Sequence, residues 1–246
     1  MRLSFLGTGA GNFRGGRRQP CSAFLDGLLL DCGAGATGRL HDLGRFVDID
    51  CVLITHLHTD HVSGLYDLLL HTLITGRQRP LTIVSPPGLS AILRVVVAAG
   101  GTVRDPASLY DLRIVEDLHP EVTVGPWRIR GVPLDHTLPD IGYLVARDGF
   151  SLFYTGDTRE PSSAREVSAD IVLHEATFSD ADRDRARQFG HSTGSQAGVA
   201  ASAMKARRLF LTHLGDATDL DQEVAREAKR SFPDTVVASD TTSFDL

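Results

Sequence analysis

The sequence predicts an α+β fold in which two sheets pack together and helices cover them. Short apolar runs of strand length recur along the chain, and several are joined in pairs by tight turns. Between them lie segments in which apolar residues recur at helical spacing. The 246 residues suffice for one substantial core, and we find no low-complexity tract or linker. We therefore expect a single domain spanning residues 1–246.

The N-terminal part of the chain is expected to alternate strands and helices. Residues 2–6 predict a strand that ends in a glycine-rich turn, and Asp26-Gly27 marks a hairpin between two short apolar runs. The run CVLIT at 51–55 has the length of a buried strand. The further elements expected before residue 100 are a helix over 62–74, a strand over 81–85 and a helix over 88–99.

Strand-like runs dominate the middle of the chain, and the last third returns to alternation. One of the middle runs turns at Asp148-Gly149, which indicates a tight hairpin. The predicted strands of this middle part are 112–116, 122–134, 142–157 and 169–178. The predicted elements after them are a helix over 193–207, a strand over 208–212, a helix over 219–231 and a strand over 235–239.

The composition is ordinary for a soluble globular protein, with 42% hydrophobic and 23% charged residues. No stretch approaches the roughly 18 apolar residues of a membrane span, and the N-terminus does not resemble a signal peptide. Three cysteines without a CxxC pair indicate reduced thiols and a cytoplasmic location. The formal charge of −6 argues mildly against a broad nucleic-acid footprint.

A cluster of histidines follows the strand predicted at 51–55. His56 and His58 are two residues apart, so in an extended backbone both imidazoles point to the same side. Asp60 and His61 follow in the expected first turn of a helix, which brings them back toward the same point. A single such residue is more often a helix cap or a solvated turn residue. Four potential ligands directly after a buried strand instead favour a metal site.

Three further candidate ligands stand where other apolar runs end. They are His136, Asp157 and His213. Each alone would more often be a capping or turn residue. Together with the cluster they give five histidines and two aspartates, which suits two ions about 3.5–4 Å apart with a bridging carboxylate.

The stretch THLHTDHVSGL resembles the HxHxDH signature of the metallo-β-lactamase fold, and DH, TGDT and LTH follow in that family's order. The resemblance implies an αββα sandwich of two mixed sheets flanked by helices, with the metal site at one edge. It also implies two divalent ions, zinc by default, with manganese or iron as alternatives. By this resemblance one ion would be held by His56, His58 and His136, the other by Asp60, His61 and His213, with Asp157 as the bridge.

VLHEATF and GHSTGSQAG resemble motifs of the ribonuclease Z group and its small phosphodiesterase relatives. The opening FLGTGAG and the residues Arg18 and Ser22 resemble the N-terminal part of the same group. The resemblance implies that His191 stands beside the scissile phosphate and that Glu175 orients it. On the residues alone, His191 could equally be a solvated neighbour of a helix cap, and Glu175 could serve only a buried donor.

The residues after His191 are predicted to bind phosphate. Ser192 and Thr193 begin the helix predicted at 193–207, and the free N–H groups of a helix start favour an anion. The expected reaction is phosphodiester hydrolysis by metal-activated water. Asp60 would orient that water and accept its proton, and His191 would stabilise the developing charge or protonate the leaving oxygen.

The sequence departs from the tRNA-processing members of the group. Long-form bacterial ribonuclease Z carries an arm that grips tRNA, and the hairpin at Asp148-Gly149 leaves no room for it. LTHLGDAT also lacks the arginine and tyrosine that usually follow. We therefore expect a small or cyclic phosphodiester as substrate, with an armless tRNA 3′-processing endoribonuclease as the first alternative.

Other classes of function stay open at this point. A thioester or lactone hydrolase could use the same seven ligands, and a non-catalytic metal-binding module is conceivable. The phosphodiesterases of phosphonate breakdown are another relative, although they often carry a cysteine-bound zinc and this N-terminal loop offers only Cys21. The resemblance also leads us to expect a homodimer and no membrane partner, with RNA as a less favoured ligand.

Overall fold

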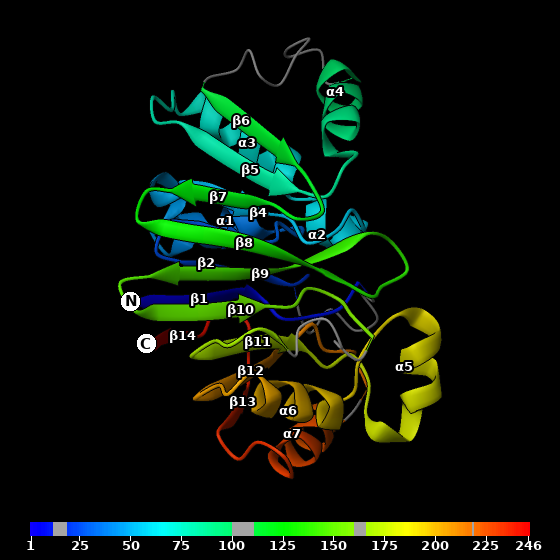
Figure 1. Cartoon of the computed structure of the whole chain (residues 1–246). Coiled ribbons are helices and arrows are strands. Elements are labelled where there is room, and N and C mark those ends of the chain that lie inside the picture. The colour runs from blue at the N-terminus through cyan, green and yellow to red at the C-terminus, as the bar shows by residue number, and fades with distance from the viewer. Residues whose placement is uncertain (12–18, 100–110, 160–165, 218) are drawn as a thin grey trace.

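Two sheets of seven strands each form the centre of the molecule, within the residues that the computed structural model describes. These residues are 1–11, 19–99, 111–159, 166–217 and 219–246. The sheets pack face to face and helices lie on their outer sides (Figure 1). The predicted αββα sandwich is confirmed.

The first sheet comes from the N-terminal half and the last strand. Its order is β14 (Ser243–Asp245), β1 (Arg2–Gly7), β2 (Ser22–Leu25), β3 (Leu28–Leu30), β4 (Cys51–Leu53), β5 (Leu81–Ser85) and β6 (Leu112–Glu116). Pairing is antiparallel from β14 to β3 and parallel from β3 to β6. The predicted hairpin is present between β2 and β3, and Asp26 and Gly27 both have positive φ there.

The second sheet repeats this pattern. Its order is β13 (Thr235–Val237), β12 (Arg208–Thr212), β11 (Ile171–Glu175), β10 (Phe150–Tyr154), β9 (Asp140–Arg147), β8 (Trp127–Leu134) and β7 (Glu121–Val124). Pairing is antiparallel from β7 to β10 and parallel from β10 to β13. Asp148 (φ 51°) and Gly149 (φ 80°) close the β9–β10 hairpin, as a two-residue turn of type I′ requires. The tight hairpin is therefore confirmed.

Helices cover both outer faces. Those of the described residues are α1 (Ala36–Asp42), α2 (Thr59–Val62), α3 (Leu65–Ile74), α4 (Leu89–Ala99), α5 (Arg183–Phe189), α6 (Gly194–Ala203) and α7 (Leu220–Lys229). Leucines of α1, α3 and α4 pack on the first sheet, and alanines of α6 together with Leu220, Val224 and Ala228 of α7 pack on the second. None of the described helices is both long and apolar enough to cross a bilayer.

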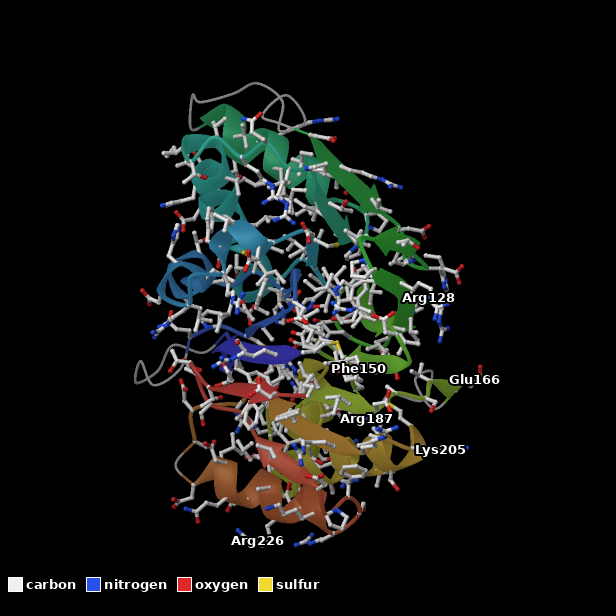
Figure 2. The ribbon with its side chains drawn as sticks, turned by 90° about the vertical axis from the view of Figure 1, so that its left-hand side faces the viewer. Arg128, Phe150, Glu166, Arg187, Lys205 and Arg226 are labelled. Atoms are coloured by element: carbon white, nitrogen blue, oxygen red, sulfur yellow. The ribbon has the colours of Figure 1, made fainter. Side chains whose placement is uncertain are left out.

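The core between the sheets combines aliphatic side chains with several large aromatic ones. Phe5 of β1 and Phe210 of β12 meet across the sandwich with ring centroids 5.5 Å apart, and both side chains are fully buried. Trp127 is buried with them and satisfies its indole N–H by donating to the Asp26 carbonyl at 3.0 Å. Figure 2 shows side chains filling this layer, whereas the labelled Arg128 and Arg226 lie at the periphery.

Several elements differ from the sequence prediction. Neither α1, α5 nor β14 was predicted, because their short segments lack an extended apolar periodicity. The helix predicted over 193–207 ends at Ala203, and the one predicted over 62–74 begins at Leu65 as α3, with the short α2 before it. The three cysteines are free, as predicted, and all three are buried. Arg18 lies outside the described residues.

Candidate active site

The strand ends gather the candidate site residues at one edge of the sandwich. β10, β11 and β12 run parallel, so their carboxyl ends meet at the same side and carry Asp157, Glu175 and His213. His136 follows β8, and the segment from His56 to His61 follows β4 of the other sheet. The site therefore takes side chains from both sheets.

The first group of side chains converges on a single point. The Nδ1 atom of His58 lies 2.9 Å from Nε2 of His56 and 3.2 Å from Nε2 of His136. Oδ2 of Asp157 lies 3.6 Å from the former Nε2 and 3.9 Å from the latter. These four ligand atoms lie within 4.8 Å of one another, so they could hold one ion.

A second group lies directly beside the first. Nε2 of His61 lies 3.2 Å from Nε2 of His213, and Oδ2 of Asp60 lies 3.6 and 3.4 Å from these two atoms. Asp157 also faces this group, with Oδ2 at 3.5 Å from His61 Nε2 and Oδ1 at 3.3 Å from His213 Nε2. One carboxylate thus stands between two ligand sets, as a bridging ligand does.

The ligand side chains are held from behind by a further layer of polar groups. A metal-binding histidine usually directs its other ring nitrogen to a carboxylate or carbonyl, which fixes its tautomer and orientation. Three of the five candidates do so here, and a fourth, His213, directs its Nδ1 to a hydroxyl. The pairs are His56 Nδ1 with Asp140 Oδ2 (2.9 Å), His61 Nδ1 with Asp31 Oδ2 (2.7 Å), His136 Nδ1 with the Gly190 carbonyl (2.7 Å) and His213 Nδ1 with Thr177 Oγ1 (2.9 Å).

Burial sets the protonation state of the first group. It lowers the pKa of His56 to about 3 and that of His136 to about 4, so both imidazoles are neutral near pH 7. For the Asp157 carboxyl, burial alone would raise the pKa, but His213 and His61 hold it well below its usual range. Neutral imidazoles and ionised carboxylates are the forms that bind metal.

The carboxylates in and around the second group require positive charge nearby. Burial would lower the pKa of His61, but the Asp157 and Asp31 carboxylates raise it well above its usual value. Oδ1 of Asp157 is buried and has no hydrogen-bond partner among the described residues. A buried carboxylate oxygen in this state needs a cation or a donor. The residues at this edge therefore fit a pair of divalent ions.

His191 and Glu175 form a pair at the border of this cluster. Nδ1 of His191 lies 3.0 Å from Oε1 of Glu175 and 3.8 Å from Oδ2 of Asp157. Burial alone would lower the pKa of His191, but the Glu175 carboxylate raises it to about 9. Glu175 is fully buried and is fixed by the backbone N–H groups of Thr158 and Thr177. His191 is thus a protonated side chain in a fixed orientation.

The side chains of the residues predicted to bind phosphate make hydrogen bonds within the protein. Ser192 Oγ donates to the Thr158 carbonyl at 2.7 Å, and Thr193 Oγ1 donates to Asp180 at 2.7 Å. Both side chains are fully buried. Thr193 forms a capping box with Gln196 at the start of α6, which confirms the predicted helix start. Their role in phosphate binding, which is expected from the backbone N–H groups of the helix start, stays a prediction.

Sequence reasoning missed the residues that support the ligands. Asp31, Asp140 and Thr177 contact three of the five histidines. The signal for Asp31 was an aspartate directly after the apolar run LLL, which is the position that also suggested Asp157. Asp140 and Thr177 carry no signal of their own, because a lone aspartate or threonine beside a strand is common.

A pocket of about 540 Å³ opens onto the candidate ligands. His58, Asp60, His191 and His213 are among the residues that line it. Gly11 approaches from the N-terminal loop, so closely that a Cβ atom there would lie 2.8 Å from Oδ2 of Asp60. The glycine-rich turn thus leaves room for the ligand carboxylate.

Comparison with known proteins agrees with this site. A sequence model of the beta-lactamase superfamily domain matches residues 27–214, which is most of the chain. The chain belongs to the beta-lactamase superfamily. It is also 32% identical over 287 aligned positions to ribonuclease Z of Halorubrum lacusprofundi, across 94% of this chain and 92% of that protein. Within the superfamily it therefore belongs to the ribonuclease Z branch.

Solved structures of superfamily members show the same sandwich. The human short-form tRNase Z superimposes with a TM-score of 0.83 at 25% identity, over 100% of this chain and 99% of that one. A diphosphatase of the PhnP family superimposes with a TM-score of 0.72 at 20% identity, over 100% and 97%, which shows the fold alone. The chain is a metal-dependent hydrolase of the superfamily.

Proposed function

We propose that this superfamily member is an endoribonuclease that removes the 3′ trailer from precursor tRNA. The observation that carries the proposal is the identity to ribonuclease Z along nearly the whole of both chains. The expected preference for a small phosphodiester over RNA finds no such support. The pairing of His191 with Glu175 beside the ligand cluster agrees with phosphodiester chemistry, and a thioester or lactone hydrolase would have no need of it.

Seven side chains would hold the metal. His56, His58 and His136 would bind one ion, Asp60, His61 and His213 the other, and Asp157 both. Zinc is the first choice for a site this rich in imidazole, with manganese or iron as alternatives. When bound, such ions lower the pKa of water and neutralise phosphate oxygens.

The remaining chemistry belongs to the protein. Asp60 lines the pocket at the ligand cluster, where it would orient the attacking water and accept its proton. His191, charged because of Glu175, would donate a proton to the leaving oxygen. Glu175 acts by holding that imidazolium in place, since its own oxygens are engaged by backbone donors.

A specific observation favours a second candidate function, the hydrolysis of a small or cyclic phosphodiester. The β9–β10 connection is the two-residue turn at Asp148-Gly149, where the resemblance would place a tRNA-gripping arm. The alignment to the Halorubrum relative also runs over 287 positions, 41 more than the 246 residues of this chain, so that relative has residues without a counterpart here. An armless enzyme would have to hold RNA through other surfaces or through a second subunit.

One experiment separates the two functions. Zinc-loaded protein is assayed against precursor tRNA with a 3′ trailer and against bis(p-nitrophenyl) phosphate, with a chelated sample beside each. The matched control is Asp157→Ala, which removes the carboxylate shared by both ligand groups. Metal-dependent release of the trailer supports the endoribonuclease. Intact tRNA together with rapid diester hydrolysis overturns it in favour of the second candidate. A homodimer and a cytoplasmic location stay predictions.

A further inference from the structure

One wall of the pocket is aromatic and lies outside the ligand cluster. It consists of Phe178, which follows β11, and of Arg185 and Phe189 on α5. Arg185 and Phe189 are four residues apart, so they lie on the same face of the helix. Both line the pocket. We call these three residues the α5 wall.

The α5 wall presents flat surfaces close to the proposed chemistry. The side chain of Phe189 is 51% exposed, so its ring has a free surface. The Arg185 guanidinium lies 5.6 Å from the centroid of the Phe178 ring, which places a planar cation over an aromatic face. The Phe178 ring in turn lies 5.9 Å from the ring of His191. The wall therefore begins one ring away from the residue proposed to act on the leaving oxygen.

The charge around the wall selects the kind of group that it suits. The pocket carries the carboxylates of Asp60, Asp157, Asp182 and Asp216, whereas Arg185 is the one arginine or lysine among its described lining residues. A second phosphate on the wall would meet several negative charges. A neutral planar ring would instead stack on Phe189 and on the guanidinium plane, as unstacked bases do in single-stranded recognition.

We propose that the α5 wall is a subsite for a nucleobase that flanks the scissile phosphate. The proposal rests on the function proposed above, because it requires a nucleotide as substrate. The base of a nucleotide is one sugar away from its phosphate, so a phosphate at the ligand cluster brings its base to the wall. Aromatic stacking tolerates every base, so the subsite would strengthen binding without selecting a sequence.

Calorimetric titration of the zinc-loaded protein tests the subsite without requiring turnover. Adenosine 5′-monophosphate and ribose 5-phosphate share the sugar and the phosphate, and the latter carries a hydroxyl in place of the base. We expect the nucleotide to bind roughly tenfold more tightly to the unmodified protein, the value that a stacked base provides. In Phe189→Ala this ratio should fall toward one, and in Arg185→Ala it should fall in the same direction.

Two exposed positions away from the pocket serve as controls. Gln188→Ala changes the neighbouring residue of α5, and Val199→Ala removes an apolar side chain of α6 that is 47% exposed. Both variants should keep the tenfold ratio. Equal binding of the two ligands by the unmodified protein, or an unchanged ratio in Phe189→Ala, would overturn the subsite.

The subsite and the proposed endoribonuclease function can fail independently of each other. If the base strengthens binding through Phe189 but precursor tRNA is not cleaved, the subsite stands and the substrate is a smaller nucleotide diester. If precursor tRNA is processed while the two ligands bind equally, the endoribonuclease stands and the subsite is wrong.

Discussion

Glu175 determines the charge on His191. Its carboxylate lies 3.0 Å from the imidazole and raises a pKa that burial alone would lower, to about 9. A general acid must be protonated, so turnover should fall as the pH rises through this pKa. Glu175→Gln removes the negative charge and should move this alkaline limb to lower pH. The measurement is kcat against pH with an unactivated nucleotide diester. If the alkaline limb does not move, the group that it reports is not His191.

The role of His191 itself depends on the leaving group. For an unactivated nucleotide diester, His191→Ala should lower kcat by roughly 10²–10⁴, the contribution of a well-placed acid. For bis(p-nitrophenyl) phosphate the loss should be much smaller, because nitrophenolate leaves without a proton. The zinc content, measured on the same samples, should be unchanged. Equal losses with both substrates would indicate that His191 stabilises charge and does not donate a proton.

Asp140 is expected to act through His56. Its Oδ2 lies 2.9 Å from Nδ1 of that histidine, and both side chains are buried. Asp140→Asn keeps the shape and replaces the carboxyl oxygen that contacts the ring, so zinc affinity should fall by roughly 10- to 100-fold. Competition with a chromophoric chelator measures this. Glu121→Gln, an exposed carboxylate on β7, is the control and should bind zinc as the unmodified protein does.

The ligand residues could be predicted from the sequence, whereas the residues behind them could not. Four candidate ligands fall between His56 and His61, and that density has few explanations other than a metal site. Asp31 and Asp140 are single carboxylates, and each lies more than twenty residues along the chain from the histidine that it supports. Their role depends on which strand ends meet, and periodicity carries no information about that.

At the scale of the element, the start of α6 both stabilises the helix and helps to position the candidate site. Thr193 forms a capping box with Gln196 and also donates to Asp180. Thr193→Ala should lower the free energy of unfolding by about 1 kcal/mol, the usual value of a helix cap. Urea unfolding of the zinc-loaded protein measures this, and Ser202→Ala, an exposed serine of the same helix, is the control.

The same variant tests whether Thr193 also binds phosphate. Its hydroxyl is buried and already donates to a carboxylate. We therefore expect Thr193→Ala to bind inorganic phosphate as tightly as the unmodified protein. A loss of phosphate affinity in this variant would show that the Thr193 hydroxyl takes part in phosphate binding.

The helix α5 could not be predicted from the sequence pattern. Its sequence RDRARQF has one buried side chain, Ala186, so it lacks the apolar stripe by which a helix is recognised. It forms over the pocket and presents Arg185 and Phe189 there. By contrast, α7 has buried residues at Leu220, Val224 and Ala228, four apart, and its position could be predicted.

At the scale of the whole molecule, the ligand cluster joins the two sheets. His56, His58 and His61 follow β4 of the first sheet, whereas His136, Asp157 and His213 follow strands of the second. The sequence predicts two packed sheets from its hairpins, but it could not predict their strand order. In each sheet the strand at the change from antiparallel to parallel pairing lies near the middle, and that arrangement results from contacts between distant segments.

Metal should therefore stabilise the fold as well as the reaction. At a free ion concentration of 100 times the dissociation constant, a ligand specific to the folded state adds about 2.7 kcal/mol. For a chain of this size, that corresponds to a shift of the melting temperature on the order of 5–10 °C. Chelation should lower the melting temperature by this amount, and returning zinc should restore it. Asp157→Ala should melt at one temperature with or without chelator.

The reactivity of three buried thiols gives an independent measure of how far bound metal stabilises the fold. Burial raises the pKa of Cys21 to about 11, and the pKa values of Cys32 and Cys51 are raised further by the same cause. The thiolate is the reactive form, so a disulfide reagent should label these residues only when the molecule opens. If the ions join the two sheets, chelation should speed the labelling of all three thiols together. Labelling at the same rate with and without metal would show that the cluster contributes to chemistry alone.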